Sequence, residues 1–229
     1  DVADLFNQLT GFAHPRGYDA IWVAPLHLRD HVIGEIDRCI REHRADAPAR
    51  ITMKMNSLVD AEVIDALYRA SQAGVRVELV VRGICCLRPG VPGLSDTIRV
   101  VSILGRFLEH ARVYRFESAD GLTTWIGSAD MMPRNLDNRI EVIAPVRDPL
   151  LAERLRDVLE LELADDAGAW ELAADGTWTR RQPAPGVQAT SSQEAFMRAA
   201  LTAAPAALPR LTQREETADR IHRGRSDDR

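Results

Sequence analysis

The residues whose types and spacing could do chemistry lie around one histidine, His110. Arg112 stands two positions further on, and on a strand residues two apart point to the same face. An imidazole can donate or accept a proton or act as a nucleophile near neutral pH, and a guanidinium offers a planar fork that matches phosphate oxygens. The pair therefore predicts a site for phosphate groups, with His110 as the catalytic residue.

Two further residues are expected to join this site. Arg82 closes an apolar run at the start of a loop, where a charge without an anionic partner is costly. Ser128 follows Gly127 at the end of a segment that could return as a hairpin strand and bring a hydroxyl and backbone N–H groups to a phosphate. The predicted phosphate-binding residues are therefore Arg82, His110, Arg112 and Ser128.

A structural role is the alternative for a single strand histidine, which could be partly buried and hydrogen-bonded to a carboxylate such as Glu109 or Asp130. Lys54 and Asn56, at the end of an earlier apolar run, carry a weaker form of the argument for an anion site. Asp130 and Asp137 could bind a metal, but two acids without a spaced ligand set favour surface ion pairs. No metal ligand is predicted.

The elements that must position these residues alternate between short β-rich runs and helical periods, which is typical of an α/β layer architecture. Ligands of open α/β sheets bind near the carboxyl ends of the strands, so the turn-rich loop at 88–93 is well placed for a site. Strands are expected at 20–25, 51–55, 75–81, 98–103, 111–116, 123–126 and 139–144, a terminal hairpin at 170–178, and helices at 28–43, 59–73, 149–163 and near 192–201.

Composition limits the class of protein. With 229 residues, of which 45% are hydrophobic and 28% charged, one main globular domain is expected. No apolar run approaches the roughly 18 residues that span a bilayer, so no transmembrane segment is predicted and a cytoplasmic setting is expected. The net charge of −5 argues against broad nucleic-acid binding, so any anion site must be local.

Four stretches, at 54–60, 81–90, 105–110 and 127–137, closely resemble class-1 polyphosphate kinase in the same order and with matching spacing. The resemblance covers about residues 1–181. It implies an α/β fold, a phospholipase D-like mixed sheet flanked by helices, over residues 20–181. Residues 1–19 would then be the end of a preceding catalytic domain, and 182–229 a mostly disordered, mobile C-terminal tail.

The resemblance also implies an activity. The family reversibly transfers the terminal phosphate of ATP to inorganic polyphosphate through a phosphohistidine, with Mg²⁺ as cofactor. The expected partners are therefore ATP or ADP and polyphosphate, and the full-length protein is expected to form homo-oligomers. The phosphorylated histidine belongs to a His-x-Lys motif upstream, which is not matched here. By resemblance His110 is the second histidine, assisting as acid, base or phosphate ligand, and Arg82 matches the arginine that contacts the nucleotide.

Three positions depart from the expected patterns. Phospholipase D enzymes would have Lys where Arg112 stands and Asn where Asp130 stands, and the family would have tryptophan where Met131 stands. The first two departures weaken the expectation of independent phosphodiesterase activity, while Met131 is expected to loosen local packing without removing a reactive group. Two alternatives stay open: a phosphodiesterase that completes its site by homodimerisation, and a non-catalytic module that binds polyphosphate or nucleotide.

Overall fold

The computed structural model describes residues 1–11 and 17–202. The chain divides into two compact units, 1–193 and 194–229, which we describe separately. The first unit contains the sheet and the candidate site. In the second, the described residues 194–202 continue helix α6 (Ser192–Thr202).

Helices and short strands follow one another along the first unit. The helices are α1 (Val2–Leu9), α2 (Leu28–Glu42), α3 (Ala61–Gln72), α4 (Pro133–Asn138) and α5 (Pro149–Leu163). The strands are β1 (Trp22–Ala24), β2 (Arg50–Met55), β3 (Arg76–Val81), β4 (Ile98–Ile103), β5 (Val113–Ser118), β6 (Gly121–Gly127), β7 (Glu141–Pro145), β8 (Ala169–Leu172) and β9 (Trp178–Arg180).

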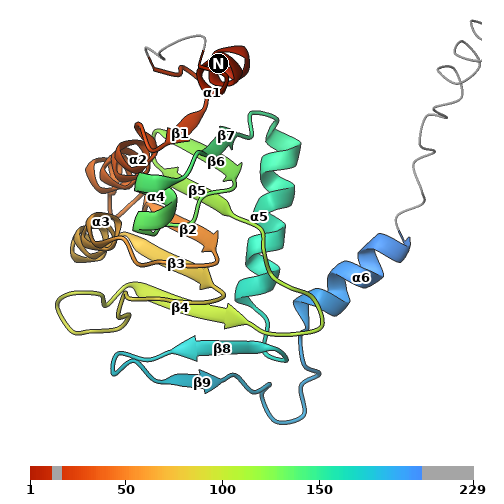
Figure 1. The fold of residues 1–229 in the computed structure, drawn as a ribbon. Helices are drawn as coiled ribbons and strands as arrows, with labels where there is room; N and C mark the ends of the chain where they lie inside the picture. Colours follow the sequence, from red (N-terminus) through yellow and green to blue (C-terminus); the bar gives the residue numbers. More distant parts are fainter. Residues whose placement is uncertain (12–16, 203–229) are drawn as a thin grey trace, which may run out of the picture. The chain divides into compact units, whose positions relative to one another are not determined.

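These strands form one mixed sheet in the order β1-β7-β6-β5-β2-β3-β4-β8-β9 (Figure 1). β2, β3 and β4 are parallel neighbours, and the other neighbouring pairs are antiparallel. The predicted α/β class and the parallel crossover β2-α3-β3 are therefore confirmed. β1 lies at the sheet edge, separated from β2 by three strands, so its crossover does not join neighbours.

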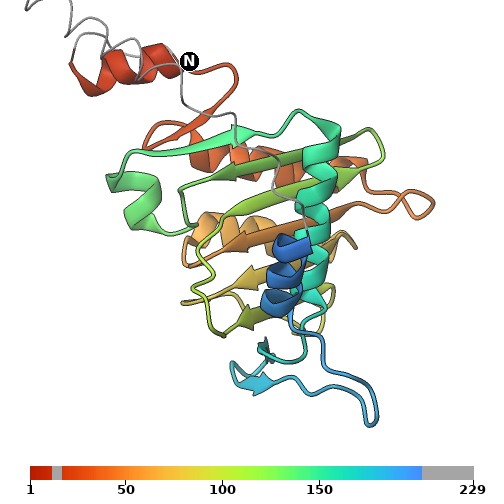
Figure 2. The ribbon, with the colours of Figure 1, turned by 90° about the vertical axis from the view of Figure 1, so that its right-hand side faces the viewer.

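The alternation of side chains in the strands explains where the core lies. In β2, Ile51, Met53 and Met55 belong to a large buried cluster with apolar residues of α2 and α3. Arg50 and Lys54 alternate with them and therefore point to the opposite face. Helix α5 crosses that opposite face, while α2 and α3 cover the first (Figure 2).

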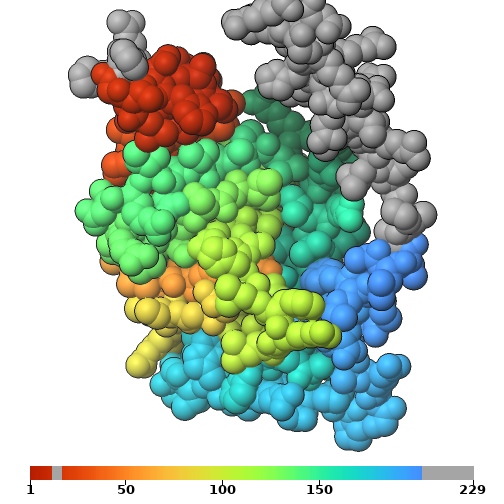
Figure 3. Space-filling view, turned by 45° about the vertical axis from the view of Figure 1, so that its right-hand side comes forward, coloured from red at the N-terminus to blue at the C-terminus, as the bar shows by residue number. Residues whose placement is uncertain are grey.

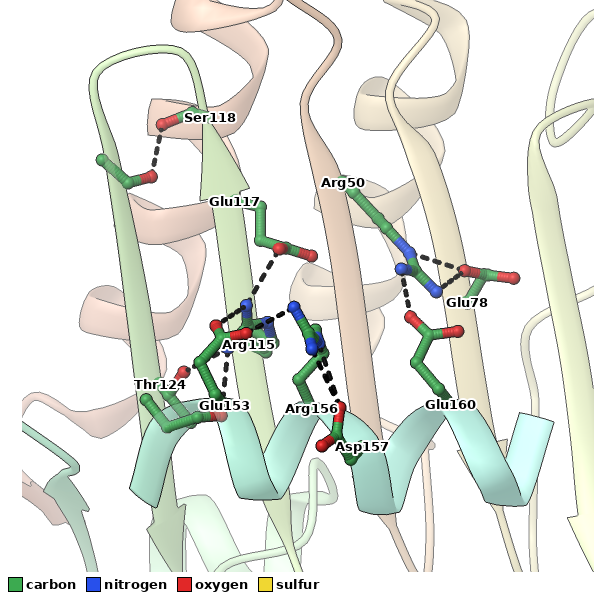
Figure 4. Close-up of polar contacts among 12 residues, drawn as sticks. Arg50, Glu78, Arg115, Glu117, Ser118, Thr124, Glu153, Arg156, Asp157 and Glu160 are labelled. Carbon is green, nitrogen blue, oxygen red and sulfur yellow. Dashed lines mark hydrogen bonds and ion pairs between the residues drawn. The ribbon is translucent and has the colours of Figure 1, made fainter. Parts of the chain in front are cut away.

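Ion pairs join helix α5 to the sheet (Figure 4), beside an apolar contact of Leu163 with β3 and β4. Arg115 of β5 lies 3.2 Å from the Glu153 carboxylate of α5, and Arg50 of β2 pairs with Glu160 of α5 and Glu78 of β3. The buried guanidinium of Arg115 is costly to desolvate unless it is paired, so these carboxylates make the interface possible. The charged side of the sheet continues toward Lys54, beneath the candidate site.

The strand expected at 111–116 begins only at Val113, and residues 104–112 form a loop, so the prediction that His110 and Arg112 lie on a strand is wrong. In the expected tail, Ser192 and Gln193 are buried at the start of α6. The part of that prediction covering residues 203–229 lies outside the described residues.

Among the described helices, none combines the length and the apolar character needed to cross a membrane.

Candidate phosphate-binding site

The candidate site lies at the sheet edge where the parallel strands β2 and β3 end. Asn56 follows β2 and Arg82 follows β3, while Arg112 precedes β5, which runs antiparallel to β2 and therefore starts at this edge. The segments that follow β2 and β3 are joined by a hydrogen bond from Leu58 N–H to the Ile84 carbonyl, at 2.8 Å. Three strands thus bring polar residues from distant parts of the chain together, as expected for the carboxyl edge of an α/β sheet.

Asp130 is the centre of the polar network at this edge. One carboxylate oxygen, Oδ1, accepts hydrogen bonds from Asn56 N–H at 2.7 Å and from Arg112 Nε at 3.2 Å. The other, Oδ2, lies 3.0 Å from Arg112 Nη2, which makes the pair bidentate. Only 12% of the Arg112 side chain and 9% of the Asp130 side chain are exposed. This buried, two-pronged pair fixes the plane of the Arg112 guanidinium.

His110 lies at the exposed end of this network. Arg112 Nη1 is 3.1 Å from His110 Nδ1, 3.3 Å from Nε2 and 2.9 Å from the His110 carbonyl oxygen, which accepts a hydrogen bond. Because a guanidinium only donates, the ring nitrogen facing it must act as the acceptor. The residue is exposed, and the lime-green loop around it lies on the molecular surface (Figure 3). The imidazole is therefore oriented by Arg112 and accessible to a ligand.

Arg82 reaches the same network from β3. Its Nε donates to Asn56 Oδ1 at 2.8 Å, and Asn56 is buried. Within residues 1–11 and 17–202, no hydrogen bond or ion pair engages the two terminal nitrogens of Arg82. Gly83 allows this close approach of the two strand ends, since a Cβ there would lie 2.9 Å from the Asn56 carbonyl oxygen. Arg82 is thus anchored at Nε while its terminal groups are available to an anion.

The structure joins three of the four predicted binding residues in one chain of contacts: His110, Arg112, Asp130, Asn56 and Arg82. Ser128 is differently engaged. Its hydroxyl accepts from Val142 N–H at 3.2 Å, and its own N–H donates to the Val142 carbonyl at 3.0 Å. The contacts of Ser128 therefore fasten the end of β6 to β7, and its role at a phosphate stays a prediction.

The contacts of His110 differ from those of a partly buried histidine hydrogen-bonded to a carboxylate, which was the alternative role. Neither Glu109 nor Asp130 is hydrogen-bonded to the imidazole, because both carboxylates have other partners in the described chain. Glu109 Oε2 lies 2.6 Å from the buried ammonium of Lys54, which also pairs with Glu162 of α5. The ammonium group of Lys54 is therefore engaged by two carboxylates of the chain itself and is not available to a bound phosphate.

This internal cluster perturbs both of its carboxylates. Burial raises the pKa of Glu162 to about 7, although Lys54 opposes the shift. For Glu109 burial also favours the neutral form, but the hydrogen bonds from Lys54 and Gln193 prevail and lower its pKa. The signal that Asp130 and Glu109 are network residues was weak in the sequence, because their partners lie 18 to 84 residues away.

The described residues do not form a metal site. Over residues 1–11 and 17–202, no three His, Cys, Asp or Glu side chains gather in the way that a metal ion would require. Both oxygens of Asp130 are occupied by Arg112 or Asn56, and Asp137 pairs with Arg29 at 2.7 Å. These residues do not fit a protein-held Mg²⁺ ion.

Together, the fold and this network define a mixed α/β domain with a cationic site, suited to phosphate groups, at the carboxyl edge of its parallel strands. Residues 21–193 match the family model described as Polyphosphate kinase C-terminal domain 2. The chain belongs to the polyphosphate kinase family. The match continues beyond residue 181, where the sequence resemblance ended, and includes the buried Gln193.

Two polyphosphate kinases support this assignment. Polyphosphate kinase 1 of Chlorobaculum tepidum is 52% identical over 199 residues, which are 86% of this chain and 28% of the relative. The crystal structure of polyphosphate kinase from Porphyromonas gingivalis matches with a TM-score of 0.82 and 36% identity, covering 88% of this chain and 31% of that chain. Nuc from Salmonella typhimurium, a phospholipase D family member, is a more distant match that covers 61% of this chain and 90% of that chain, with a TM-score of 0.46 and 18% identity. This chain spans less than a third of the two polyphosphate kinases.

Proposed function

We propose that this chain supplies the second-histidine part of a polyphosphate kinase site, in which the γ-phosphate of ATP is transferred reversibly to inorganic polyphosphate. The observation that carries the proposal is the continuous network from the exposed His110 to Arg82, whose terminal nitrogens are available to an anion. Family membership supports the same substrates. The expected cytoplasmic setting, homo-oligomers of the full-length protein and lack of nucleic-acid binding stay predictions.

Each residue of the network has a distinct proposed role. Arg82 binds phosphate oxygens through its planar terminal groups, either on the nucleotide or on the polyphosphate chain. His110 donates or accepts a hydrogen bond at the transferring phosphoryl group, as acid, base or phosphate ligand. Arg112 contributes positive charge and orients His110, because most of its donors are committed to Asp130 and His110.

The nucleophile in this proposal is not His110 but the family's other histidine, that of the His-x-Lys motif. Its attack on the γ-phosphorus breaks the bond to ADP and forms a phosphorus–nitrogen bond. A terminal polyphosphate oxygen then attacks the same phosphorus and releases the histidine. Mg²⁺ would be held by the nucleotide phosphates rather than by residues of this chain, and would supply positive charge that offsets theirs. The chain itself provides the cationic surface on which the phosphoryl group is transferred.

The experiment is a measurement of ATP-dependent polyphosphate synthesis by this chain alone and by the chain fused to the upstream part of a polyphosphate kinase. We expect little synthesis by the chain alone, synthesis by the fusion, and loss of that synthesis in the fusion carrying His110→Ala. Gln72→Ala, a surface change on α3, serves as the control. Robust synthesis by the isolated chain would contradict the proposal that it holds only part of the site.

The same samples separate the two alternatives. Hydrolysis of a generic phosphodiester by the isolated chain, lost on His110→Ala, would favour a homodimeric phosphodiesterase. Binding of polyphosphate that survives His110→Ala, is lost on Arg82→Ala and is accompanied by no turnover in the fusion would favour a binding module.

A further inference from the structure

The loop that carries His110 lacks the support of a strand. Residues 104–112 lie outside the strands, and their backbone is bonded to neighbouring segments at its ends, by Leu104 N–H to the Gly168 carbonyl and by Gly127 N–H to the Arg112 carbonyl. Three apolar side chains of this loop are at least half exposed: 55% for Leu104, 50% for Phe107 and 67% for Leu108. Segments with few buried apolar contacts open easily. A catalytic side chain on such a loop needs specific contacts to hold it in one place.

Gln193 provides those contacts from a distant part of the sequence. Its Oε1 accepts from Phe107 N–H at 3.0 Å, and its Nε2 donates to the Phe107 carbonyl at 2.9 Å. The same Nε2 donates to Glu109 Oε1 at 2.7 Å. Only 7% of Gln193 is exposed, so its amide is buried while the loop that it contacts is partly exposed. The amide side chain of Gln193 is therefore hydrogen-bonded to the loop at Phe107 and Glu109, and Glu109 directly precedes His110.

Glu109 and Gln193 are both held by other residues of the domain. Glu109 is held on its other oxygen, Oε2, by Lys54 of β2 at 2.6 Å. Next to Gln193, Ser192 donates to Asp165 Oδ2 from its N–H and from its hydroxyl, each at 2.7 Å, and Asp165 is buried. These contacts of Glu109 and Gln193 therefore connect the His110 loop to the sheet and to the segment that follows α5.

Gly105 shows how close this contact is. A Cβ at position 105 would lie 2.5 Å from Gln193 Oε1 and 3.0 Å from its Cδ. The side chain of Gln193 could move aside only by giving up hydrogen bonds to Phe107 and Glu109. A glycine at this position therefore lets the amide lie against the loop backbone.

We propose that Gln193 is a positioning residue for His110, acting through Phe107 and Glu109. The relevance of this role to phosphoryl transfer rests on the function proposed above, since small displacements of a catalytic group strongly reduce its rate. The placement of the loop itself does not depend on the substrate. Gln193 does not touch the reacting groups, so it is not a catalytic residue.

The test is NMR spectroscopy of the 229-residue chain and its Gln193→Ala variant. We expect the Phe107 amide to exchange on the order of tenfold faster in the variant, because its hydrogen bond is lost. We also expect the His110 imidazole resonances to shift and broaden. Gln72→Ala is the matched control: it removes a surface amide that donates to the Gly93 carbonyl at 3.2 Å and should leave both signals unchanged.

Two further variants separate positioning from a general loss of stability. Gly105→Ala should disturb the same two signals while Gln193 is still present. Gln193→Glu keeps the acceptor for Phe107 N–H but sets a carboxylate against Glu109. In the double variant Gln193→Glu with Glu109→Gln, the amide introduced at position 109 can donate to the carboxylate introduced at position 193, so protection of the Phe107 amide should partly return.

Unchanged Phe107 exchange and unchanged His110 resonances in both Gln193→Ala and Gly105→Ala would overturn the proposal, as would the same changes in Gln72→Ala. Failure of the double variant to recover protection relative to Gln193→Glu would also count against it. None of these signals requires phosphate. Absence of polyphosphate binding by the wild-type chain would therefore defeat the proposed function, while the NMR result alone decides the position of the loop.

Discussion

Replacing Asp130 by asparagine tests whether the buried pair with Arg112 organises the site. Asparagine keeps the shape and one acceptor oxygen, which can still serve Asn56 N–H and Arg112 Nε. Its amide group, however, places a donor against the donor at Arg112 Nη2, which now lies 3.0 Å from Oδ2. The change therefore removes half of the bidentate pair and all of its charge complementarity.

The expected cost follows from the burial of both partners. Breaking a buried ion pair by removing one charge destabilises a protein by about 3–5 kcal/mol. Because Arg112 keeps its contacts with His110, we expect the lower end, about 3 kcal/mol, for Asp130→Asn. Asp37→Asn is the matched control, since Asp37 pairs with Arg69 at side-chain exposures of 38% and 51%. Exposed pairs of this kind contribute about 0–1 kcal/mol.

Urea unfolding followed by circular dichroism measures both free energies of unfolding. The double variant Arg112→Lys with Asp130→Asn recreates the residue pair typical of phospholipase D enzymes. Its destabilisation should be smaller than the sum of the two single changes by at least about 1 kcal/mol, because neighbouring sites couple. If Asp130→Asn costs no more than Asp37→Asn, the pair does not organise this edge of the sheet.

Three further predictions concern the surroundings of the site. Burial raises the pKa of Glu162 from 4.5 to about 7. The contribution of Glu162 to the free energy of unfolding is therefore fully present below about pH 4.5 and is lost as the pH rises through about 7. In Glu162→Gln, the free energy of unfolding should fall by up to about 3 kcal/mol less over this pH range than in the wild-type chain, as measured by urea unfolding at several pH values. Parallel pH profiles of the two proteins would contradict this prediction. Gly83→Ala, with its Cβ 2.9 Å from the Asn56 carbonyl, should cost about 1–3 kcal/mol and weaken polyphosphate binding; unchanged unfolding would count against the close approach. Asp165→Ala removes the buried carboxylate that accepts four hydrogen bonds, from the N–H groups of Ala167, Gly168 and Ser192 and from the Ser192 hydroxyl. It should lower Tm by roughly 6–12 °C in a thermal melt, and a shift under about 2 °C would be the contrary result.

Local patterns were enough to predict most of the sheet and the position of Arg82. The alternation in β2 and the helical period of α3 depend on neighbouring residues, so the β2-α3-β3 unit could be read directly. The rule that ligands bind at the carboxyl ends of parallel strands then placed Asn56 and Arg82 at one edge. These are properties of short segments and of topology.

The partners within the site could not be predicted in the same way. The pairing of Arg112 with Asp130, and of Gln193 with Phe107 and Glu109, joins segments up to 86 residues apart and depends on the final strand order. Ser128 was placed at the site by its position after a strand, but its hydroxyl lies on the β7 side of that strand end, at Val142. Pattern alone does not distinguish these two sides.

The most direct test of the central claim is the affinity of this chain for a short polyphosphate at about 0.1 M salt, where long-range attraction is largely screened. Arg82→Ala should weaken binding by at least about tenfold, as expected for losing charge-assisted hydrogen bonds. Arg69→Ala, which removes the same charge from the exposed face of α3, should change the affinity by less than about twofold. Equal affinities for the wild-type chain and Arg82→Ala would contradict the assignment of this sheet edge as the phosphate site.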